Sequence, residues 1–377
     1  MTTRRIAVLG GGNGGHAMAA HKTLEGFQVS LFELPQFAKR LRKVIASRDI
    51  TVQWNDRTET AKVFRVTTDI ASALDGAEIV YVVTPAFGHR SMAEACAPFV
   101  KSGQIICLTP GSGGSLEFAR VLGGKAGESG ILLCESSTLP YGARLIAPGH
   151  VRIHVEAATL PTGVFPSNQT KAAIRKLQDV YPMTVPAANV LEAALNNPNP
   201  IVHPAATLLN AGRIEFSKGR FYLYKEGMTP SVARVYEAME RERFSLLRAA
   251  RLRYHHYAGL EPGGHNLGET REECRERILQ TSMDAAFGPD SIQAGIQMKG
   301  PTSMHDRFIT EDVPYGLVLM GTLGRMLGVP TPMIDAVVNL CGAINRIDYW
   351  RTGRGVDSLG LSGMSPARLS AYLETGR

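Results

Sequence analysis

The stretch RRIAVLGGGNGGHAMAAH, residues 4–21, constrains the fold of this chain more than any other. The apolar run IAVL stops at a cluster of glycines, and an alanine-rich segment follows. Gly10, Gly12 and Gly15 have the G-x-G-x-x-G spacing, which allows a tight turn, a close approach of backbone to a ligand, and close packing of a helix on a strand. The pattern predicts a strand, a turn and a helix in succession.

A second signal downstream indicates what this turn binds. Another apolar run, Val29 to Phe32, ends on Glu33, about 20 residues beyond the glycines, where a carboxylate that binds a ribose is expected. The helix after the glycines offers unpaired N–H groups and a positive dipole end to a pyrophosphate. Together these features predict a dinucleotide site. The residues predicted to contact the cofactor here are Gly10, Gly12, Asn13, Gly15 and Glu33.

Glu33 also favours NAD(H) over NADP(H), because a carboxylate accepts hydrogen bonds from a ribose 2′-OH and repels a 2′-phosphate. Lys39, Arg40 and Arg42 follow closely and offer cations to a phosphate. The NADP(H) alternative therefore stays open.

Size and charge limit the class of protein. A chain of 377 residues exceeds what one hydrophobic core usually serves, so we expect two domains. The net charge of +7 suits anionic substrates and a pyrophosphate. It does not indicate nucleic-acid binding, because the densest basic stretch, residues 241–253, carries apolar residues at helical spacing. No apolar stretch reaches the roughly 18 residues that a membrane span needs.

The cysteines give no sign of a metal site or a disulfide framework, because their number is odd and no C-x-x-C pair occurs. The five residues are Cys96, Cys107, Cys134, Cys274 and Cys341. The apolar run near the N-terminus is also too short for a secretory signal. We therefore expect buried thiols, no metal, and a cytoplasmic location.

Strands alternate with helices over roughly the first 180 residues, which predicts a doubly wound, mainly parallel sheet. The expected strands are residues 6–9, 29–32, 79–83, 104–108, 131–134 and one from 150, with short extra strands within 51–66. Ligands of such sheets lie beyond the carboxyl ends of the strands. The loops 84–89, 109–115 and 135–144 are thus expected to face the nicotinamide, with Pro85 as a further cofactor contact.

From about residue 190 the strand-like runs end and amphipathic stretches replace them. The expected helices are residues 190–195, 205–216, 231–254, 270–281, 315–327 and 332–347. The fold class predicted is an α/β Rossmann domain, residues 1–187, followed by an all-α domain, residues 188–377.

His203 stands out among the ten histidines, because it lies in an uncharged, proline-punctuated segment, NNPNPIVHPAATLLN, at the start of the helical domain. Histidine is the usual proton carrier near neutral pH. A purely structural role is the alternative for a lone histidine.

The segment MHDRFITEDVPYGLV supplies two further candidates. Arg307 has a guanidinium that binds a carboxylate bidentately. Asp312 is suited to orient a histidine through its second ring nitrogen. Alternatively, Asp312 caps the helix that follows it.

The chain resembles the octopine/nopaline (opine) dehydrogenase family, within a wider group that includes glycerol-3-phosphate and ketopantoate reductases. The stretches that carry the resemblance are VLGGGNGGHA, VVTPAFGH, NPNPIVHPAATLLNAG, YLYKEGMTPSV, RFITEDVPYGLV and VPTPMIDAVV. The resemblance implies that His203 is the catalytic histidine, Asp312 its partner and Arg307 the anchor of a substrate carboxylate. It also implies that Ser136 lies near the oxo acid, where family members often have threonine.

By this resemblance, an amino acid and a 2-oxo acid such as pyruvate condense to an imine, which NADH reduces to a secondary amine, and the helical domain forms a homodimer. Two other readings stay open. A simple 2-oxo acid or ketopantoate-type reductase would oxidise NADH with the oxo acid alone. A noncatalytic NADH sensor would bind the cofactor without turnover.

Overall fold

The structure is a computed structural model that describes residues 4–123, 130–254 and 299–377. It divides into two compact units, Met1–Ala194 with Ala371–Arg377, and Leu195–Ser370. The first unit thus extends further than residue 187 and includes the end of the chain. One reason is the tight packing of β11 (Leu160–Phe165) against the start of α8 (Val190–Leu195), since a Cβ on Gly163 would lie 2.2 Å from the carbonyl oxygen of Asn189.

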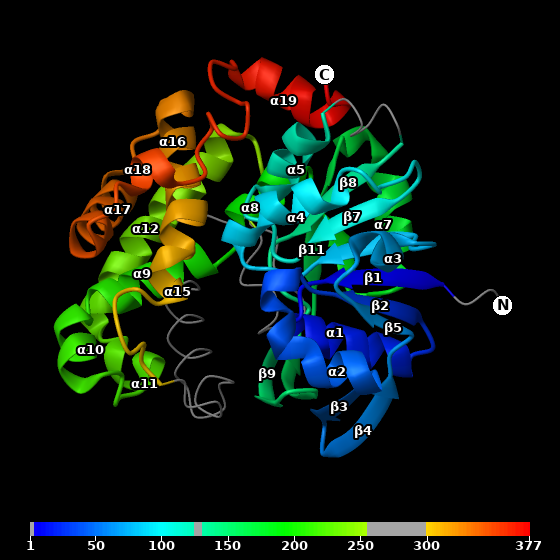
Figure 1. The fold of residues 1–377 in the computed structure, drawn as a ribbon. Helices are drawn as coiled ribbons and strands as arrows, with labels where there is room; N and C mark the ends of the chain where they lie inside the picture. The colour runs from blue at the N-terminus through cyan, green and yellow to red at the C-terminus, as the bar shows by residue number, and fades with distance from the viewer. Residues whose placement is uncertain (1–3, 124–129, 255–298) are drawn as a thin grey trace. The chain divides into compact units, whose positions relative to one another are not determined.

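The first unit is built on an eight-stranded sheet with the order β12-β11-β8-β7-β6-β1-β2-β5 (Figure 1). The strands are β1 (Arg5–Leu9), β2 (Gln28–Phe32), β5 (Arg65–Thr67), β6 (Ile79–Val82), β7 (Ile105–Leu108), β8 (Leu132–Ser136), β11 (Leu160–Phe165) and β12 (Thr184–Pro186). Neighbouring strands are parallel except β11 and β8, which are antiparallel. The predicted Rossmann-like, mainly parallel sheet is confirmed, although β11 and β12 were not expected.

Helices cover both faces of this sheet, and the strands are therefore buried on both sides. Alternate strand residues such as Val8, Tyr81 and Cys107 share one core with α1 (Asn13–Leu24) and α7 (Thr170–Gln178). Leu108, which points to the other face, contacts the start of α5 (Gly114–Leu122), and α5 packs on α4 (His89–Cys96). The remaining helical segments are η1 (Pro35–Leu41), α2 (Arg42–Ser47), α3 (Ile70–Leu74), η2 (Ala86–Gly88) and η3 (Ser167–Gln169).

A second sheet, with the order β4-β3-β10-β9, packs on α1. Its strands are β3 (Asp49–Trp54), β4 (Arg57–Lys62), β9 (Tyr141–Ala147) and β10 (His150–Glu156). The extra strands expected within residues 51–66 are present. The loop predicted at 135–144 is wrong at both ends, because β8 continues to Ser136 and β9 begins at Tyr141. The alternation of buried Tyr141 and Ala143 with exposed Arg144 is the strand signal there.

The second unit is helical. Its described elements are α9 (Asn199–Leu208), α10 (Ala211–Ser217), α11 (Leu223–Gly227), α12 (Pro230–Ala249), α15 (Arg307–Thr310), η5 (Val313–Leu317), α16 (Val318–Leu327), α17 (Pro332–Asn345) and α18 (Tyr349–Thr352), with α19 (Pro366–Thr375) ending in the first unit. The single helix expected at 205–216 is two helices, because Asn210 breaks it and its amide donates to the Ala206 and Gly227 carbonyls. The helix expected at 270–281 lies outside the described residues.

Two further predictions concern the whole chain. Four cysteines in the described part of the chain are buried free thiols, as expected, and Cys274 lies outside it. Within residues 4–123, 130–254 and 299–377, no helix has both the length and the apolar character needed to cross a membrane.

Candidate active site

The three glycines of the N-terminal turn do three different things. Gly10 has a φ of +117°, and a Cβ there would lie 2.4 Å from the Val83 carbonyl oxygen. A Cβ on Gly15 would lie 1.8 Å from the Gly10 carbonyl oxygen, so this glycine lets α1 pack on the turn. A Cβ on Gly12 meets nothing within 4 Å. Two of the glycines therefore serve the fold, and Gly12 borders open space.

The start of α1 fits a pyrophosphate. Gly12 is the residue before the first turn of α1, and no side chain caps that turn. Its first N–H groups therefore stay available to an anion. Glu33 lies beside them, and its carboxylate accepts hydrogen bonds from the Gly11 N–H at 3.0 Å and the Leu34 N–H at 2.9 Å. A carboxylate has four acceptor positions, so Glu33 keeps capacity for ribose hydroxyls.

Two predicted cofactor residues have contacts that sequence reasoning did not find. The side-chain oxygen of Asn13 accepts a hydrogen bond from the Leu145 N–H at 2.9 Å, which fastens β9 to the start of α1. Pro85 follows β6 and precedes η2, where it sets the direction of the loop. His16, almost fully buried, hydrogen-bonds through Nδ1 to the Gly12 carbonyl oxygen at 3.0 Å and braces the turn.

A buried carboxylate clamps the loop that follows β7. Glu135, which is 0% exposed, accepts hydrogen bonds from the Gly113 and Ser115 N–H groups at 3.0 Å each and from the Ser115 hydroxyl. An acidic residue inside an apolar strand was the available signal for this clamp. The next residue, Ser136, is also buried, and its hydroxyl donates to the Thr138 carbonyl at 2.7 Å. That hydroxyl is engaged by the turn after β8.

The second unit brings together two of the predicted catalytic residues. His203 on α9 and Asp312, directly before η5, are 109 residues apart in sequence, yet His203 Nδ1 lies 2.8 Å from Asp312 Oδ2. Their side chains are 17% and 11% exposed. The imidazole also stacks on Phe308, with ring centroids 4.1 Å apart and planes 24° apart. Because a carboxylate accepts, Nδ1 carries the hydrogen, and Nε2 is the nitrogen that can accept a proton.

Charges around Asp312 act in opposite directions. Burial raises the pKa of the Asp312 carboxyl above its ordinary value, while the charge and hydrogen bond of His203 lower it. Glu311 also raises this pKa, and Arg307 lowers it. The buried Asp312 carboxylate thus accepts a hydrogen bond from the His203 imidazole, and this arrangement fixes the tautomer of the imidazole.

Arg307 differs from its prediction in one respect, because it already has a carboxylate partner. Its Nε donates to Glu311 Oε2 at 2.7 Å, and Nη2 lies 2.6 Å from the same oxygen. The Arg307 side chain is 63% exposed, and that of Glu311 is 15% exposed. Sequence reasoning missed Glu311 and Phe308, although the four-residue spacing of Glu311 from Arg307 on a helix was a usable signal.

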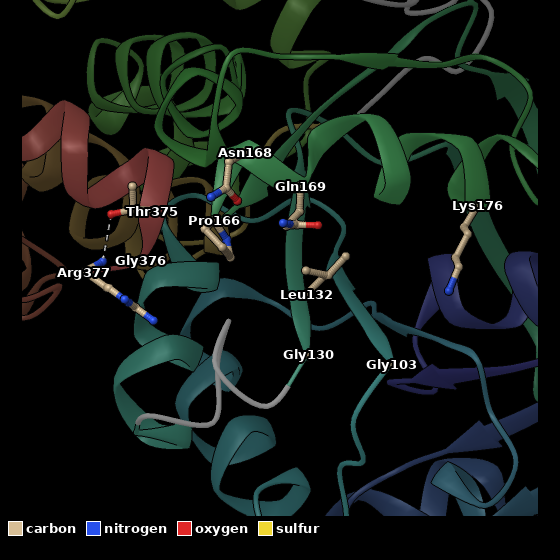
Figure 2. A pocket seen from close by; sticks show the side chains of 10 residues that line it. All are labelled: Gly103, Gly130, Leu132, Pro166, Asn168, Gln169, Lys176, Thr375, Gly376 and Arg377. Carbon is tan, nitrogen blue, oxygen red and sulfur yellow. Dashed lines mark hydrogen bonds between the residues drawn. The ribbon is translucent and has the colours of Figure 1, made fainter.

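A pocket in the first unit lies beyond the amino ends of strands of the large sheet, and the glycine turn follows the carboxyl end of β1 (Figure 2). Gly103 and Gly130, which line it, precede β7 and β8, so the pocket is at the amino ends of these strands. The rest of its lining includes Asn168, Gln169 and Lys176. Ligands of doubly wound sheets bind at the carboxyl ends of the strands, so this pocket is not the dinucleotide site.

Family models of dehydrogenases match both the N-terminal and the helical part of the chain. The family model for the alpha-helical domain of NAD/NADP octopine/nopaline dehydrogenase matches residues 186–345, and that for the NAD-dependent glycerol-3-phosphate dehydrogenase N-terminus matches residues 5–112. An opine dehydrogenase of Arthrobacter sp. (strain 1C) is 32% identical over 373 residues, which cover 99% of each chain.

Solved structures share the fold. An octopine dehydrogenase with NADH and L-arginine has a TM-score of 0.73 at 20% identity, and one with NADH and pyruvate has 0.69 at 20%; each covers 100% of this chain and 98% of that one. A yersinopine dehydrogenase with NADP⁺ bound has 0.70 at 16% identity, covering 99% and 98%. With 32% identity to an opine dehydrogenase over nearly all of both chains, this chain belongs to the opine dehydrogenase family of NAD(P)-dependent oxidoreductases that act on CH–NH donors.

Proposed function

We propose that the enzyme condenses an L-amino acid with a 2-oxo acid of about the size of pyruvate and reduces the imine, with NADH preferred over NADPH. The observation that carries this proposal is the hydrogen bond between His203 Nδ1 and Asp312 Oδ2. It leaves one imidazole nitrogen for proton transfer and places a carboxylate behind the other.

His203 and Asp312 handle the protons in this proposal. Bound NAD(P)H supplies a hydride, and the protein supplies the protons and the geometry. His203 Nε2 takes a proton from the substrate ammonium, and the free amine attacks the carbonyl carbon. The same nitrogen carries this proton to the carbonyl oxygen and then carries a second proton from the bound amine to the resulting hydroxyl, which leaves as water when the protonated imine forms. Asp312 fixes the tautomer and stabilises the imidazolium between these two steps.

Arg307 is proposed to anchor the carboxylate of the oxo acid, which positions its carbonyl carbon. A guanidinium edge binds a carboxylate with two parallel hydrogen bonds, and such orientation supplies several kcal/mol of rate acceleration. Support comes from an octopine dehydrogenase solved with pyruvate and with L-arginine, which shows both substrate classes on this fold. Ser136 is the proposed second contact of the oxo acid, and in this role its hydroxyl would have to exchange the Thr138 carbonyl for the substrate.

The proposed preference for NADH rests on Glu33, whose charge lies next to the turn. The yersinopine dehydrogenase bound to NADP⁺ is an example of the NADP(H) alternative on this fold. Glu33→Gln keeps an acceptor for the Gly11 N–H and removes the charge. The ratio of kcat/KM with NADH to that with NADPH should then fall about tenfold, or 1.4 kcal/mol. An unchanged ratio would show that the charge of Glu33 does not set the preference.

The test of the whole proposal is NADH oxidation, followed by the cofactor absorbance, with pyruvate alone and with pyruvate plus each of a panel of amino acids. Oxidation that requires both substrates supports the proposal and identifies the amine. Oxidation with pyruvate alone would assign the chain to simple reduction. Cofactor binding without turnover under every pairing would contradict the proposed substrates. The homodimer and the cytoplasmic location stay predictions.

A further inference from the structure

The guanidinium of Arg307 is occupied along one edge. Its Nε and Nη2 both contact Glu311 Oε2, at 2.7 and 2.6 Å. This is the edge that binds a carboxylate side-on with two parallel hydrogen bonds. A substrate carboxylate that takes this edge must therefore displace Glu311 or share the guanidinium with it.

Exposure differs between the two partners. Arg307 is 63% exposed, so a carboxylate in solution reaches it, whereas Glu311 is 15% exposed and is followed directly by the buried Asp312. Glu311 is close enough to Asp312 to raise its pKa, and Arg307 is close enough to lower it. Three charged groups thus interact, and Arg307 is the cation among them.

The charges favour competition over sharing. With Glu311 in place, the guanidinium is already neutralised, and an added carboxylate would face two negative side chains with one positive one. The attraction between a substrate carboxylate and Arg307 is then offset by repulsion from Glu311. Repulsion falls when Glu311 loses its charge, while Arg307 keeps its hydrogen-bond donors.

We propose that Glu311 is an internal competitor that holds the Arg307 guanidinium until a substrate carboxylate displaces it, and so sets the affinity for the 2-oxo acid. This inference rests on the proposed role of Arg307 as the carboxylate anchor. In this proposal Glu311 lowers the affinity for every carboxylate that uses this edge of Arg307 by a similar factor, because each must displace the same tethered side chain.

The expected effect is moderate. Exposed Arg–Glu pairs one helical turn apart contribute up to about 1 kcal/mol, equivalent to about fivefold in affinity. Glu311 is mostly buried and lies beside a second carboxylate, so its removal has a somewhat larger effect. Glu311→Gln should tighten binding of a substrate carboxylate about three- to tenfold.

The experiment is calorimetric titration of the full-length enzyme, saturated with NADH, with oxamate, an unreactive analogue of pyruvate. Five proteins are compared: the wild type, Glu311→Gln, Arg307→Gln, the double variant, and Glu94→Gln. Glu94 forms an Arg–Glu pair of the same spacing with Arg90 on α4, in the other unit. This control removes the same charge from a pair that does not include Arg307.

The proposal predicts tighter oxamate binding by Glu311→Gln, weaker binding by Arg307→Gln, no effect of Glu311→Gln on the Arg307→Gln background, and no effect of Glu94→Gln. If Glu311→Gln binds oxamate no more tightly than the wild type, while Arg307→Gln binds it more weakly, then Glu311 is not a competitor and Arg307 is still the anchor. Weaker oxamate binding by Glu311→Gln would mean that Glu311 orients Arg307. Equal tightening of oxamate binding by Glu94→Gln would show that the effect comes from the net charge of the protein and not from Glu311 itself. Unchanged binding by Arg307→Gln would instead refute the anchor itself.

Discussion

The glycine turn of the first unit and the His203–Asp312 pair of the second unit show two ways of building a functional site. The turn uses backbone groups and empty space supplied within residues 10–33, and its contacts are short in sequence. The pair uses two side chains 109 residues apart, which meet because α9 packs against α15 and η5. A site of the first kind can be recognised from spacing, and one of the second kind depends on tertiary packing.

Substitutions in the two sites are also expected to have different consequences. A substitution in the turn fails by steric overlap, because carbonyl oxygens lie where Cβ atoms would be at Gly10 and Gly15. A substitution in the pair is expected to keep the packing and to remove the proposed proton transfer, because the replacing residue fills the space without an imidazole or a carboxylate. Variants of the two regions should therefore separate folding and cofactor binding from turnover.

The largest expected effect is that of His203→Ala on turnover. Loss of a positioned general acid–base group lowers kcat by about 10² to 10⁴. The dissociation constant for NADH, measured by fluorescence titration, should stay the same. His305→Ala, at an exposed histidine of the same unit, is the matched control and should turn over normally. A fall in kcat of less than about tenfold would show that His203 is not the proton carrier.

Asp312→Asn is expected to have the next largest effect, on the order of 10-fold to 100-fold in kcat. An amide cannot enforce the Nδ1–H tautomer or stabilise an imidazolium as a carboxylate does. The pH profile supplies a second readout. The pKa of Asp312 is raised, so wild-type activity should fall on the acid side as this carboxyl gains a proton, and the variant should lack that limb. An identical acid limb in both proteins would assign it to another group.

Gly12→Ala and Gly15→Ala test the glycine turn with one methyl group each. At Gly15 the methyl overlaps the Gly10 carbonyl, so the variant should lose about 3 kcal/mol of unfolding free energy. At Gly12 the backbone has φ −81°, which alanine adopts, and the methyl meets no protein atom within 4 Å. Gly12→Ala should therefore melt near the wild-type temperature and bind NADH at least about tenfold more weakly. Normal cofactor affinity in Gly12→Ala would show that no ligand approaches that residue.

The local features of the chain could be predicted from the sequence. The first strand, the turn, α1 and the second strand with Glu33 follow from glycine spacing and short apolar runs, because these features are local. The helical unit was recognised as helical from periodicity alone. The break between α9 and α10 was missed, because it depends on hydrogen bonds from Asn210 to carbonyls both within its own turn and 17 residues away.

The site in the helical unit was predicted by a different route. Periodicity gave no reason to join His203 to Asp312, and the resemblance to opine dehydrogenases supplied that pairing. Phe308 was overlooked because a stacking partner becomes visible only when α15 is placed, whereas the four-residue spacing of Glu311 from Arg307 was a signal in the sequence itself. Likewise, the loop predicted at 135–144 overlaps the start of β9, although Tyr141, Ala143 and Leu145 alternate with Gly142 and Arg144 in the sequence.

The smallest expected effect is a change of stability with pH that comes from a histidine in the first unit. His21 of α1, like His203, has one ring nitrogen near a carboxylate, with Nε2 3.1 Å from Glu25 Oε1 and Nδ1 2.6 Å from the Tyr141 hydroxyl. Burial, together with the charge of Lys22, lowers the pKa of His21 to about 4, although Glu25 acts in the opposite direction. His21 is thus held neutral as a structural group.

The sign of the pH effect follows from this lowered pKa. Above pH 6.5 both the folded and the unfolded chain carry a neutral His21, and the full stability is present. Between pH 6.5 and about 4 the unfolded chain binds a proton that the folded chain resists, so stability falls as the pH falls. Between pH 7 and 5 the loss should be about 2 kcal/mol from this group.

Urea unfolding at these two pH values measures the loss, and His21→Gln should remove most of it. Trp54 reports on the site, since its ring centroid lies 4.4 Å from that of His21, and Trp350→Phe removes the other tryptophan signal. Glu156, whose pKa is raised by burial, acts with the opposite sign, and it remains in both proteins and cancels in their difference. An equal pH dependence in His21→Gln would mean that His21 is protonated in the folded chain, and that the contrast with His203 does not hold.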